Sequence, residues 1–313
     1  MQLRWRVTSV ETNAIHELAS SFSRVRQLPR LETINLTFYP FCFNRLGSDG
    51  RGRLALQASV LDALAGSFSV RVPPKLTSFF LHNLRTWDLH PLESPSFQTV
   101  LTTLRRLKVH VLFDRSPSVR IFDDRWGHFW SSLFPRMILA PTQHALTELT
   151  LHSDGRVGAS SGLTLAGLHF PHLCALSLCH LFFQPSVGVE PFVLRHAATL
   201  AQLELLACKL PDPTDTLLSQ SPSTALARDE ESSSEPGGWD RIWDRFAAEL
   251  TALITLHVDP KCRYVDLVSL WEIDTPESRN AADAAALRRF HMTVTARSEE
   301  TRGGNPEGER GGA

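Results

Sequence analysis

An excess of charge of one sign is missing from this sequence. It has 32 Lys and Arg residues against 33 Asp and Glu residues, which gives a net charge of -1 over 313 residues. A chain this close to neutral has no long-range basic field with which to attract a phosphate backbone. We therefore expect no nucleic-acid partner.

Long hydrophobic runs are missing as well. No stretch approaches the roughly 20 consecutive apolar residues of a membrane span, and the start at Met1–Arg6 lacks the apolar core of a signal peptide. The five cysteines are an odd number scattered along the chain, which does not suit a disulfide framework. They are Cys42, Cys174, Cys179, Cys208 and Cys262. We expect a soluble protein of a reducing compartment, cytoplasmic or nuclear, with no membrane contact.

Motifs of common catalytic sites are absent too. The sequence has no glycine-rich phosphate loop followed by Lys-Ser or Lys-Thr, no CxxC pair and no HExxH. Residues 158–162 fit the G-x-S-x-G nucleophile elbow, but residues 163–171 are too short and broken for the helix that this motif requires. We therefore expect no catalysis, no metal and no cofactor. A serine hydrolase using Ser160 is the less favoured alternative.

A short pattern recurs along the chain instead. An apolar residue is followed by two variable residues, an apolar one, a variable one and a third apolar one. Seven copies occur, at residues 31–36, 76–81, 104–109, 146–151, 173–178, 200–205 and 253–258. Three of the six intervals between their starts fall in the range of about 20 to 29 residues that is typical of a leucine-rich repeat, and the longer ones are interpreted as repeats with insertions.

The pattern predicts a short strand whose alternate side chains enter a core, followed by a turn and a helix that covers this core. Apolar residues at helical spacing lie between copies, at 15–25, 56–64 and 126–133, and Ser94-Pro95 is a predicted helix start. We expect strands and helices to alternate throughout. The predicted fold is an irregular α/β leucine-rich-repeat solenoid, with parallel strands on the concave face and helices on the convex face.

Composition divides the chain into four segments. Residues 1–211 form the predicted solenoid. Residues 212–238 are rich in Ser, Pro and acidic residues and poor in large apolar ones, so we predict a disordered insertion. Residues 239–296 contain the last repeat and a C-terminal capping helix, and residues 297–313 are predicted to be a disordered tail.

The fifth and seventh positions of each copy are expected to point away from the core, onto the concave face. Histidines occupy the seventh position of three copies and Cys179 that of the next, so they should form a ladder at about 5 Å strand spacing. Phe80 is an aromatic residue in a fifth position, where it is either a binding anchor or covered by a loop. The predicted partner-binding residues are Phe80, His82, Lys108, His110, Thr150, His152, Ser177, Cys179 and Glu204.

Three imidazoles and a thiol are also a potential zinc ligand set. Parallel stacking does not create tetrahedral geometry, and no Asp or Glu is evident to orient the histidines, so a partner-contact ladder is favoured over a metal site. A second group is close in sequence, but strand alternation sends its members to different faces. It comprises His169, His172, Cys174, Cys179 and His180.

The segments Phe170–Leu178, Val189–His196 and Leu200–Leu205 have a strand, helix, strand rhythm. They resemble the variable, insertion-rich leucine-rich repeats of F-box proteins as these occur in fungi, and the resemblance covers roughly residues 7–211 and 239–296. It implies substrate recruitment, in which the repeats hold a protein target while an F-box module docks on a Skp1-type adaptor of a cullin ubiquitin ligase.

No F-box motif is found in the sequence, and the chain is expected to begin within the repeats, with a hydrophobic end near Trp5 and Val7. A Skp1-type adaptor is therefore an expected partner only if an F-box lies upstream. The expected function is a non-catalytic protein-protein interaction module of the substrate-recognition type. A free-standing leucine-rich-repeat scaffold with no ubiquitin link is the alternative.

The insertion provides a first prediction. Excising residues 212–238 should leave the thermal unfolding of the repeats nearly unchanged, because the segment has few apolar side chains to contribute to a core. The measurement is the melting temperature of the excised and the complete chain. A large drop would show that the segment packs against the repeats.

Overall fold

In the computed structural model, the described residues are 1–7, 21–22, 24–38, 50–70, 73, 75–86, 89–113, 124–158, 162–211, 238–265 and 277–303. Several predictions fall outside these residues: Cys42, Ser160, most of the first helical stripe, residues 212–237 of the insertion, and the tail beyond residue 303. No helix in the described ranges is both long and apolar enough to cross a membrane.

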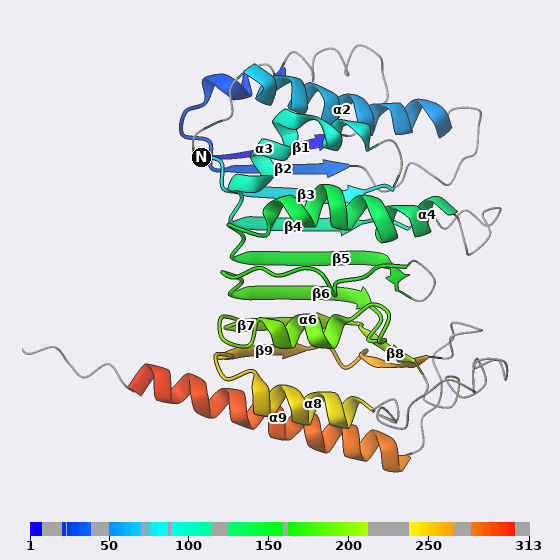
Figure 1. The fold of residues 1–313 in the computed structure, drawn as a ribbon, viewed down its shortest axis with the longest axis vertical. Helices are drawn as coiled ribbons and strands as arrows, with labels where there is room; N and C mark the ends of the chain where they lie inside the picture. Colours follow the sequence, from blue (N-terminus) through cyan, green and yellow to red (C-terminus); the bar gives the residue numbers. More distant parts are fainter. Residues whose placement is uncertain are drawn as a thin grey trace, which may run out of the picture.

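Eight parallel strands form one sheet, in the order in which they occur along the chain (Figure 1). Seven of them correspond to the seven copies of the pattern, and each of these begins at the third position of its copy. The strands are β1 (Gln2–Val7), β2 (Thr33–Phe38), β3 (Ser78–Leu84), β4 (Arg106–Val111), β5 (Glu148–Val157), β6 (Ala175–Leu181), β7 (Gln202–Leu206) and β9 (Thr255–Val258). The α/β class and the parallel strands are thus confirmed.

The fourth position of every copy lies in one row across the sheet. Each of these side chains is paired with the fourth-position residue of the next strand, and all but the last are buried. The row consists of Ile34, Phe79, Leu107, Leu149, Leu176, Leu203 and Leu256. Because strand side chains alternate between faces, this register directs the sixth positions into the same core.

Helical segments provide the other layer of the core, and α3, α4 and α6 lie over the sheet in Figure 1. Ser94 caps α3 as predicted, since its Oγ accepts a hydrogen bond from the Phe97 amide at 3.3 Å and Pro95 follows it. The helical segments are η1 (Val25–Gln27), α2 (Gly50–Val70), η2 (His90–Glu93), α3 (Pro95–Thr103), α4 (Asp124–His128), η3 (Phe129–Leu133), η4 (Pro135–Leu139), α5 (Ala140–Thr142), α6 (Val189–Arg195), α8 (Trp239–Glu249) and α9 (Glu277–Gly303).

The expectation that strands and helices alternate throughout is wrong between β5 and β6. Residues 162–174 contain no helix, although Leu163, Leu165 and Phe170 are buried. The backbone amide of Leu165 donates to the Val187 carbonyl at 2.9 Å, and that of Phe170 donates to a buried histidine at 3.0 Å. A segment without a helix can cover the core here because these acceptors satisfy backbone amides that would otherwise need hydrogen bonds within a helix.

The buried histidine is His196. Its Nδ1 donates to the Phe192 carbonyl at 2.7 Å while its Nε2 accepts from the Phe170 amide, so both ring nitrogens have partners. Burial lowers the pKa of His196, which is consistent with a neutral ring whose Nε2 carries no proton. This side chain therefore joins α6 to the segment that replaces a helix.

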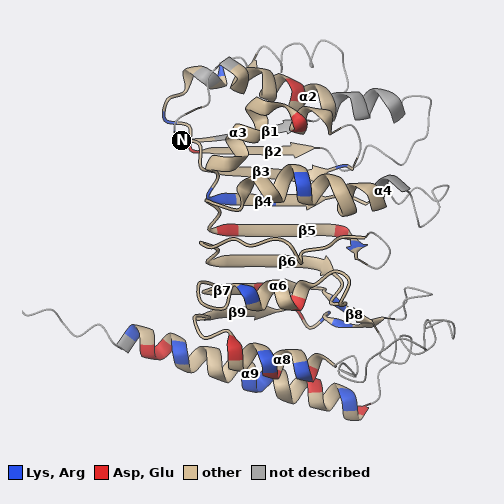
Figure 2. Ribbon diagram, in the orientation of Figure 1, with Lys and Arg blue, Asp and Glu red and all other residues tan. Residues whose placement is uncertain are grey.

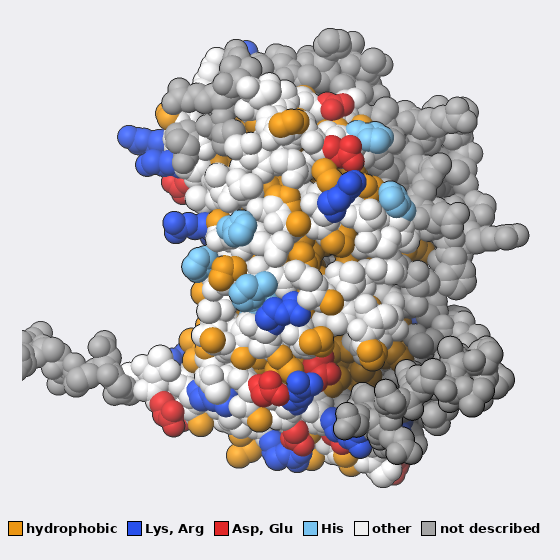
Figure 3. Space-filling view, in the orientation of Figure 1, with side chains coloured by type: hydrophobic (Ala, Val, Ile, Leu, Met, Phe, Trp, Pro, Cys, Tyr) orange, Lys and Arg blue, Asp and Glu red, His pale blue; other side chains and the backbone are white. Residues whose placement is uncertain are grey.

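The C-terminal end of the molecule is closed by a helix, as predicted, but that helix is longer than expected. Helix α9 continues to Gly303, so residues 297–303, assigned to a disordered tail, are helical. Phe290 of α9 packs against Trp243 and Phe246 of α8, and Arg289 forms a 2.8 Å ion pair with Asp244. Charged side chains of both signs gather on these two helices (Figures 2 and 3).

Two features were not predicted. Strand β1 extends the sheet beyond the first copy, and the alternation of apolar Leu3, Trp5 and Val7 with polar residues could have indicated it. The second feature is a small parallel sheet of β8 (Lys209–Pro211) and β10 (Arg263–Val265), which the six-residue pattern does not contain.

Replacement of a side chain in the fourth-position row should destabilise the fold strongly. Leu149→Ala removes buried methyl groups between two neighbouring strands and should lower the free energy of unfolding by about 2–5 kcal/mol. Its neighbour Thr150 is half-exposed, so Thr150→Ala should cost less than about 0.5 kcal/mol. Urea unfolding of both variants tests this, and equal losses would contradict the assigned faces.

Candidate functional site

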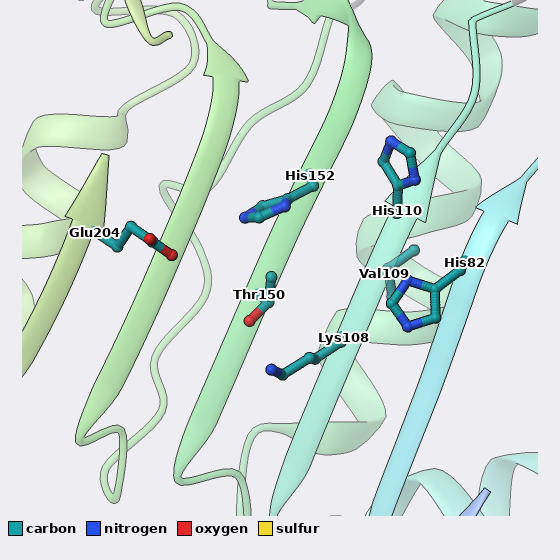
Figure 4. Close-up of a pocket in the computed structure, with 7 residues that line it drawn as sticks. All are labelled: His82, Lys108, Val109, His110, Thr150, His152 and Glu204. Carbon is teal, nitrogen blue, oxygen red and sulfur yellow. The ribbon is translucent and has the colours of Figure 1, made fainter. Parts of the chain in front are cut away.

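The side of the sheet opposite the helices is called the open face here. It is formed by the fifth and seventh positions of the copies, and every one of these residues is exposed or half-buried, whereas their neighbours in sequence are mostly buried. All nine predicted partner-binding residues lie on this face. Six of them line a single hollow of about 290 Å³, together with Val109: His82, Lys108, His110, Thr150, His152 and Glu204 (Figure 4).

The other three predicted residues, Phe80, Ser177 and Cys179, do not line the hollow but lie next to residues that do. Ser177 hydrogen-bonds to two of the lining residues, and Phe80 lies under Lys108. Cys179 is paired in register with His152 on the neighbouring strand. The structure therefore brings the predicted residues together across β3 to β7.

A chain of hydrogen bonds fixes His152 in the hollow. Ser177 donates its hydroxyl proton to Glu204, so the serine oxygen accepts from His152, whose Nε2 lies 2.8 Å away. His152 is consequently a donor at Nε2. In a nucleophilic triad the serine donates to the histidine, so this arrangement has the opposite direction and does not activate Ser177.

A second chain fixes His110 and includes a residue that the sequence analysis missed. Asn83 donates from Nδ2 to the Phe38 carbonyl at 2.7 Å, so its Oδ1 accepts from His110 Nδ1 at 3.0 Å. Asn83 has a φ of 62°, in the left-handed region that Asn adopts more readily than most residues. An Asn directly after a seventh position is the sequence signal that could have identified it.

Phe80 and Lys108 form the edge of the hollow on the side of β3 and β4. The Lys108 ammonium lies 5.3 Å from the centre of the Phe80 ring, which is cation-π distance. Phe80 is half-exposed and Lys108 is exposed. The pair presents an aromatic surface and a positive charge at one place.

The electrostatics of the hollow favour neutral imidazoles. Burial lowers the pKa of His82, His110 and His152 from the ordinary value of 6.5, and the nearby imidazoles lower it further. Asp154 opposes this shift at His110 and Glu204 opposes it at His152, but burial prevails in both. At neutral pH the positive charge of the hollow therefore comes from Lys108.

The histidine ladder does not converge as metal ligands do. Among the residues that the structure describes, no three or more His, Cys, Asp or Glu side chains are placed to hold a metal ion. Burial raises the pKa of Cys179 to about 11, so its thiol keeps its proton. The expectation that no carboxylate orients the histidines is wrong, because Glu204 lies behind Ser177 and acts on His152 through it.

The second group of His and Cys residues does not form a site. His169 stacks on His196 with ring centres 5.5 Å apart, and the exposed Cys174 is at the opposite end of β6 from Cys179. His180 donates from Nδ1 to the Ser153 carbonyl at 2.6 Å. Cys174 is thus separated from Cys179, whereas His180 departs from strand alternation: its φ is 59°, and it is one of the imidazoles that lower the pKa of His110 and His152.

The alternative of a serine hydrolase has little support around its motif. Ser160 lies outside the described residues, and residues 162–174 after it contain no helix. The nucleophile elbow requires a helix directly after the serine.

Comparisons with known proteins add no relative. No protein-family model matches the chain, and no curated protein matches it. The likeness to the repeats of F-box proteins therefore rests on the residue pattern alone.

The three histidines make stability depend on pH. Their pKa values are lower in the folded chain than the ordinary 6.5, so the unfolded chain binds more protons in the interval between. The free energy of unfolding should be highest above about pH 6.5 and should fall as the pH drops through that interval. The test is to measure the free energy of unfolding in urea between about pH 8 and about pH 5, in steps of about half a pH unit.

The matched variant replaces all three histidines with Gln. Its slope of stability against pH should be smaller, with a remainder from His196 and His291, whose pKa values are also lowered by burial. An unchanged slope would contradict the assignment to the hollow.

Proposed function

We propose that this chain is a protein-binding module and that its sheet is the concave face of an irregular leucine-rich-repeat solenoid. The observation that carries the proposal is the open face, where side chains of β3, β4, β5 and β7 line one hollow and Phe80 and Ser177 lie beside it. Side chains in a row across parallel strands provide a broad surface rather than a deep cavity, which suits a protein segment.

The chemistry of the open face supports a partner of mixed character. Lys108 of β4 is basic and Glu204 of β7 is acidic, and Arg106 and Glu148, at the third positions of β4 and β5, add one charge of each sign. Phe80 adds an aromatic contact beside Lys108, and aromatic and basic residues are enriched among binding hot spots. A surface with both signs of charge is poorly suited to a uniformly charged phosphate backbone.

The resemblance to F-box proteins supports a more specific form of the proposal. In that form the open face holds a substrate of a ubiquitin ligase, and a Skp1-type adaptor binds an F-box encoded upstream. The alternative is a scaffold that binds its partner without a ubiquitin ligase. The adaptor contact distinguishes these two forms, and the open face is the binding surface in both.

Binding should depend on the open face. The double variant Phe80→Ala/Lys108→Glu removes the aromatic contact and reverses the charge, so partner affinity should fall roughly tenfold or more, which is about 1.4 kcal/mol. Tagged wild-type and variant chains are used for quantitative capture from cells, followed by affinity measurement on any protein that the variant loses.

The control is Arg288→Glu, which makes the same charge change at an exposed position of α9. It should capture the same proteins as the wild type. Binding at the open face would be contradicted if the double variant lost none of the proteins that the wild type captures. A Skp1-type adaptor captured by every variant would support the ubiquitin-ligase form, and its absence from captures with the complete gene product would favour the scaffold.

A further inference from the structure

Two cysteines far apart in sequence meet beyond the C-terminal ends of β7 and β9. Strand β10 pairs with β8 so that Arg263 is opposite Lys209, and the Arg263 amide donates to the Cys208 carbonyl at 3.3 Å. One step back in this register places Cys262 opposite Cys208. Both are free thiols in the structure.

The backbone spacing suits a covalent bond between them. Neighbouring strands lie about 4.8 Å apart, and the Cα atoms of disulfide-bonded cysteines are usually about 4.4–6.8 Å apart. Cys208 Sγ donates to the Leu178 carbonyl and Cys262 Sγ to the Leu205 carbonyl, each at 3.6 Å, and these two leucines are paired in register on β6 and β7. To form the bond, each thiol has to leave its carbonyl partner and turn toward the other.

The environments of the two thiols differ in a way that assigns them different roles. Cys208 is fully buried, and burial raises its pKa well above the ordinary value. Cys262 is partly exposed, and its pKa is lowered, chiefly by the neighbouring Cys208 thiol and also by the Lys209 ammonium. Burial and Asp259 oppose that shift without reversing it. Lys209 is held there because its Nζ donates to the Lys261 carbonyl at 2.9 Å.

We propose that Cys208 and Cys262 are a reactive dithiol site that takes low-molecular-weight disulfides, such as glutathione disulfide, as co-reactants. Cys262 is the attacking thiol and Cys208 the resolving thiol. This site is independent of the open-face binding proposed above. In a reducing compartment, a disulfide of this kind forms only transiently.

The reaction proceeds in two exchanges. The Cys262 thiolate attacks one sulfur of glutathione disulfide, breaks its S–S bond and releases one glutathione thiolate, leaving a mixed disulfide. Cys208 then loses its proton to the released thiolate and attacks the Cys262 sulfur, displacing the second glutathione. Two protein thiols are oxidised to one disulfide, and one glutathione disulfide is reduced to two glutathione molecules.

Cys179 is a competitor among the described cysteines, because its ionisation is coupled to that of both Cys208 and Cys262. Its raised pKa of about 11 makes it a poor attacking thiol at neutral pH. The Cys208–Cys262 bond would close a loop that contains α8 and β9, so it would tie the last strand of the sheet to β7.

The test uses the reduced wild-type chain, incubated with glutathione disulfide at neutral pH and then alkylated. Two of its five thiols should be lost from alkylation, and peptide mapping should find Cys208 linked to Cys262. Cys208→Ser should accumulate a glutathione adduct on Cys262, whereas Cys262→Ser should leave Cys208 unmodified. Cys174→Ser is the matched control and should form the same disulfide as the wild type.

The decisive readout is the linkage in the wild type, so it does not depend on the variants folding. Retention of all five thiols after exposure to glutathione disulfide would overturn the proposal. A Cys179–Cys262 linkage, or adducts only on the exposed Cys174, would overturn it as well.

Discussion

The packing of one apolar side chain per strand, in register across parallel strands, is the constraint on which the rest of this structure depends. The fourth-position row, from Ile34 to Leu256, lies between the sheet and its covering helices. A slip of one residue in any strand would turn its apolar side chains outward and bring polar ones into the core. The register is therefore fixed by burial, without any contact on the open face.

This constraint also determines what the open face can be. Once the fourth positions are aligned, the fifth and seventh positions are aligned in rows of their own, so histidines separated by 28 or 42 residues become neighbours. Half-burial among such neighbours disfavours protonation and requires hydrogen-bond partners. The chains from His152 to Glu204 and from His110 to Phe38 meet this requirement. They also restrain the side chains of the hollow, which would reduce the entropy cost of the partner binding proposed above.

The sequence was sufficient to predict seven of the eight strands of the main sheet, their parallel pairing and the residues of the open face, because a six-residue pattern encodes which side chains are buried. Strands β1, β8 and β10 lie outside that pattern and were not predicted. It was not sufficient to predict contacts between different rows. Glu204 is 52 residues after His152 and two strands away, and only the position of Ser177 between them makes them partners. The absence of a helix over residues 162–174 was not predicted either. This segment depends on hydrogen-bond acceptors from a later part of the chain, such as His196, which accepts from the Phe170 amide.

At the ends of the strands, the backbone conformation of a single residue determines which of the next side chains is buried. Regular alternation would bury the eighth position, as it does at Val111 and Ser153. In three other units the eighth residue, Asn83, His180 or Ala207, has a positive φ, and the ninth residue is fully buried.

This change explains why the register shifts where Leu84 pairs with Val111, a ninth position opposite an eighth. A left-handed residue other than glycine costs roughly 1–2 kcal/mol, and Asn83 offsets part of that cost by donating to the preceding strand. Ala207 has no such side chain, so the burial of Cys208 after it is the compensation visible there. The left-handed conformation of Ala207 thus turns the side chain of Cys208 into the interior, next to Cys262. At this end of the sheet the buried position is therefore occupied by a thiol and not by an aliphatic side chain.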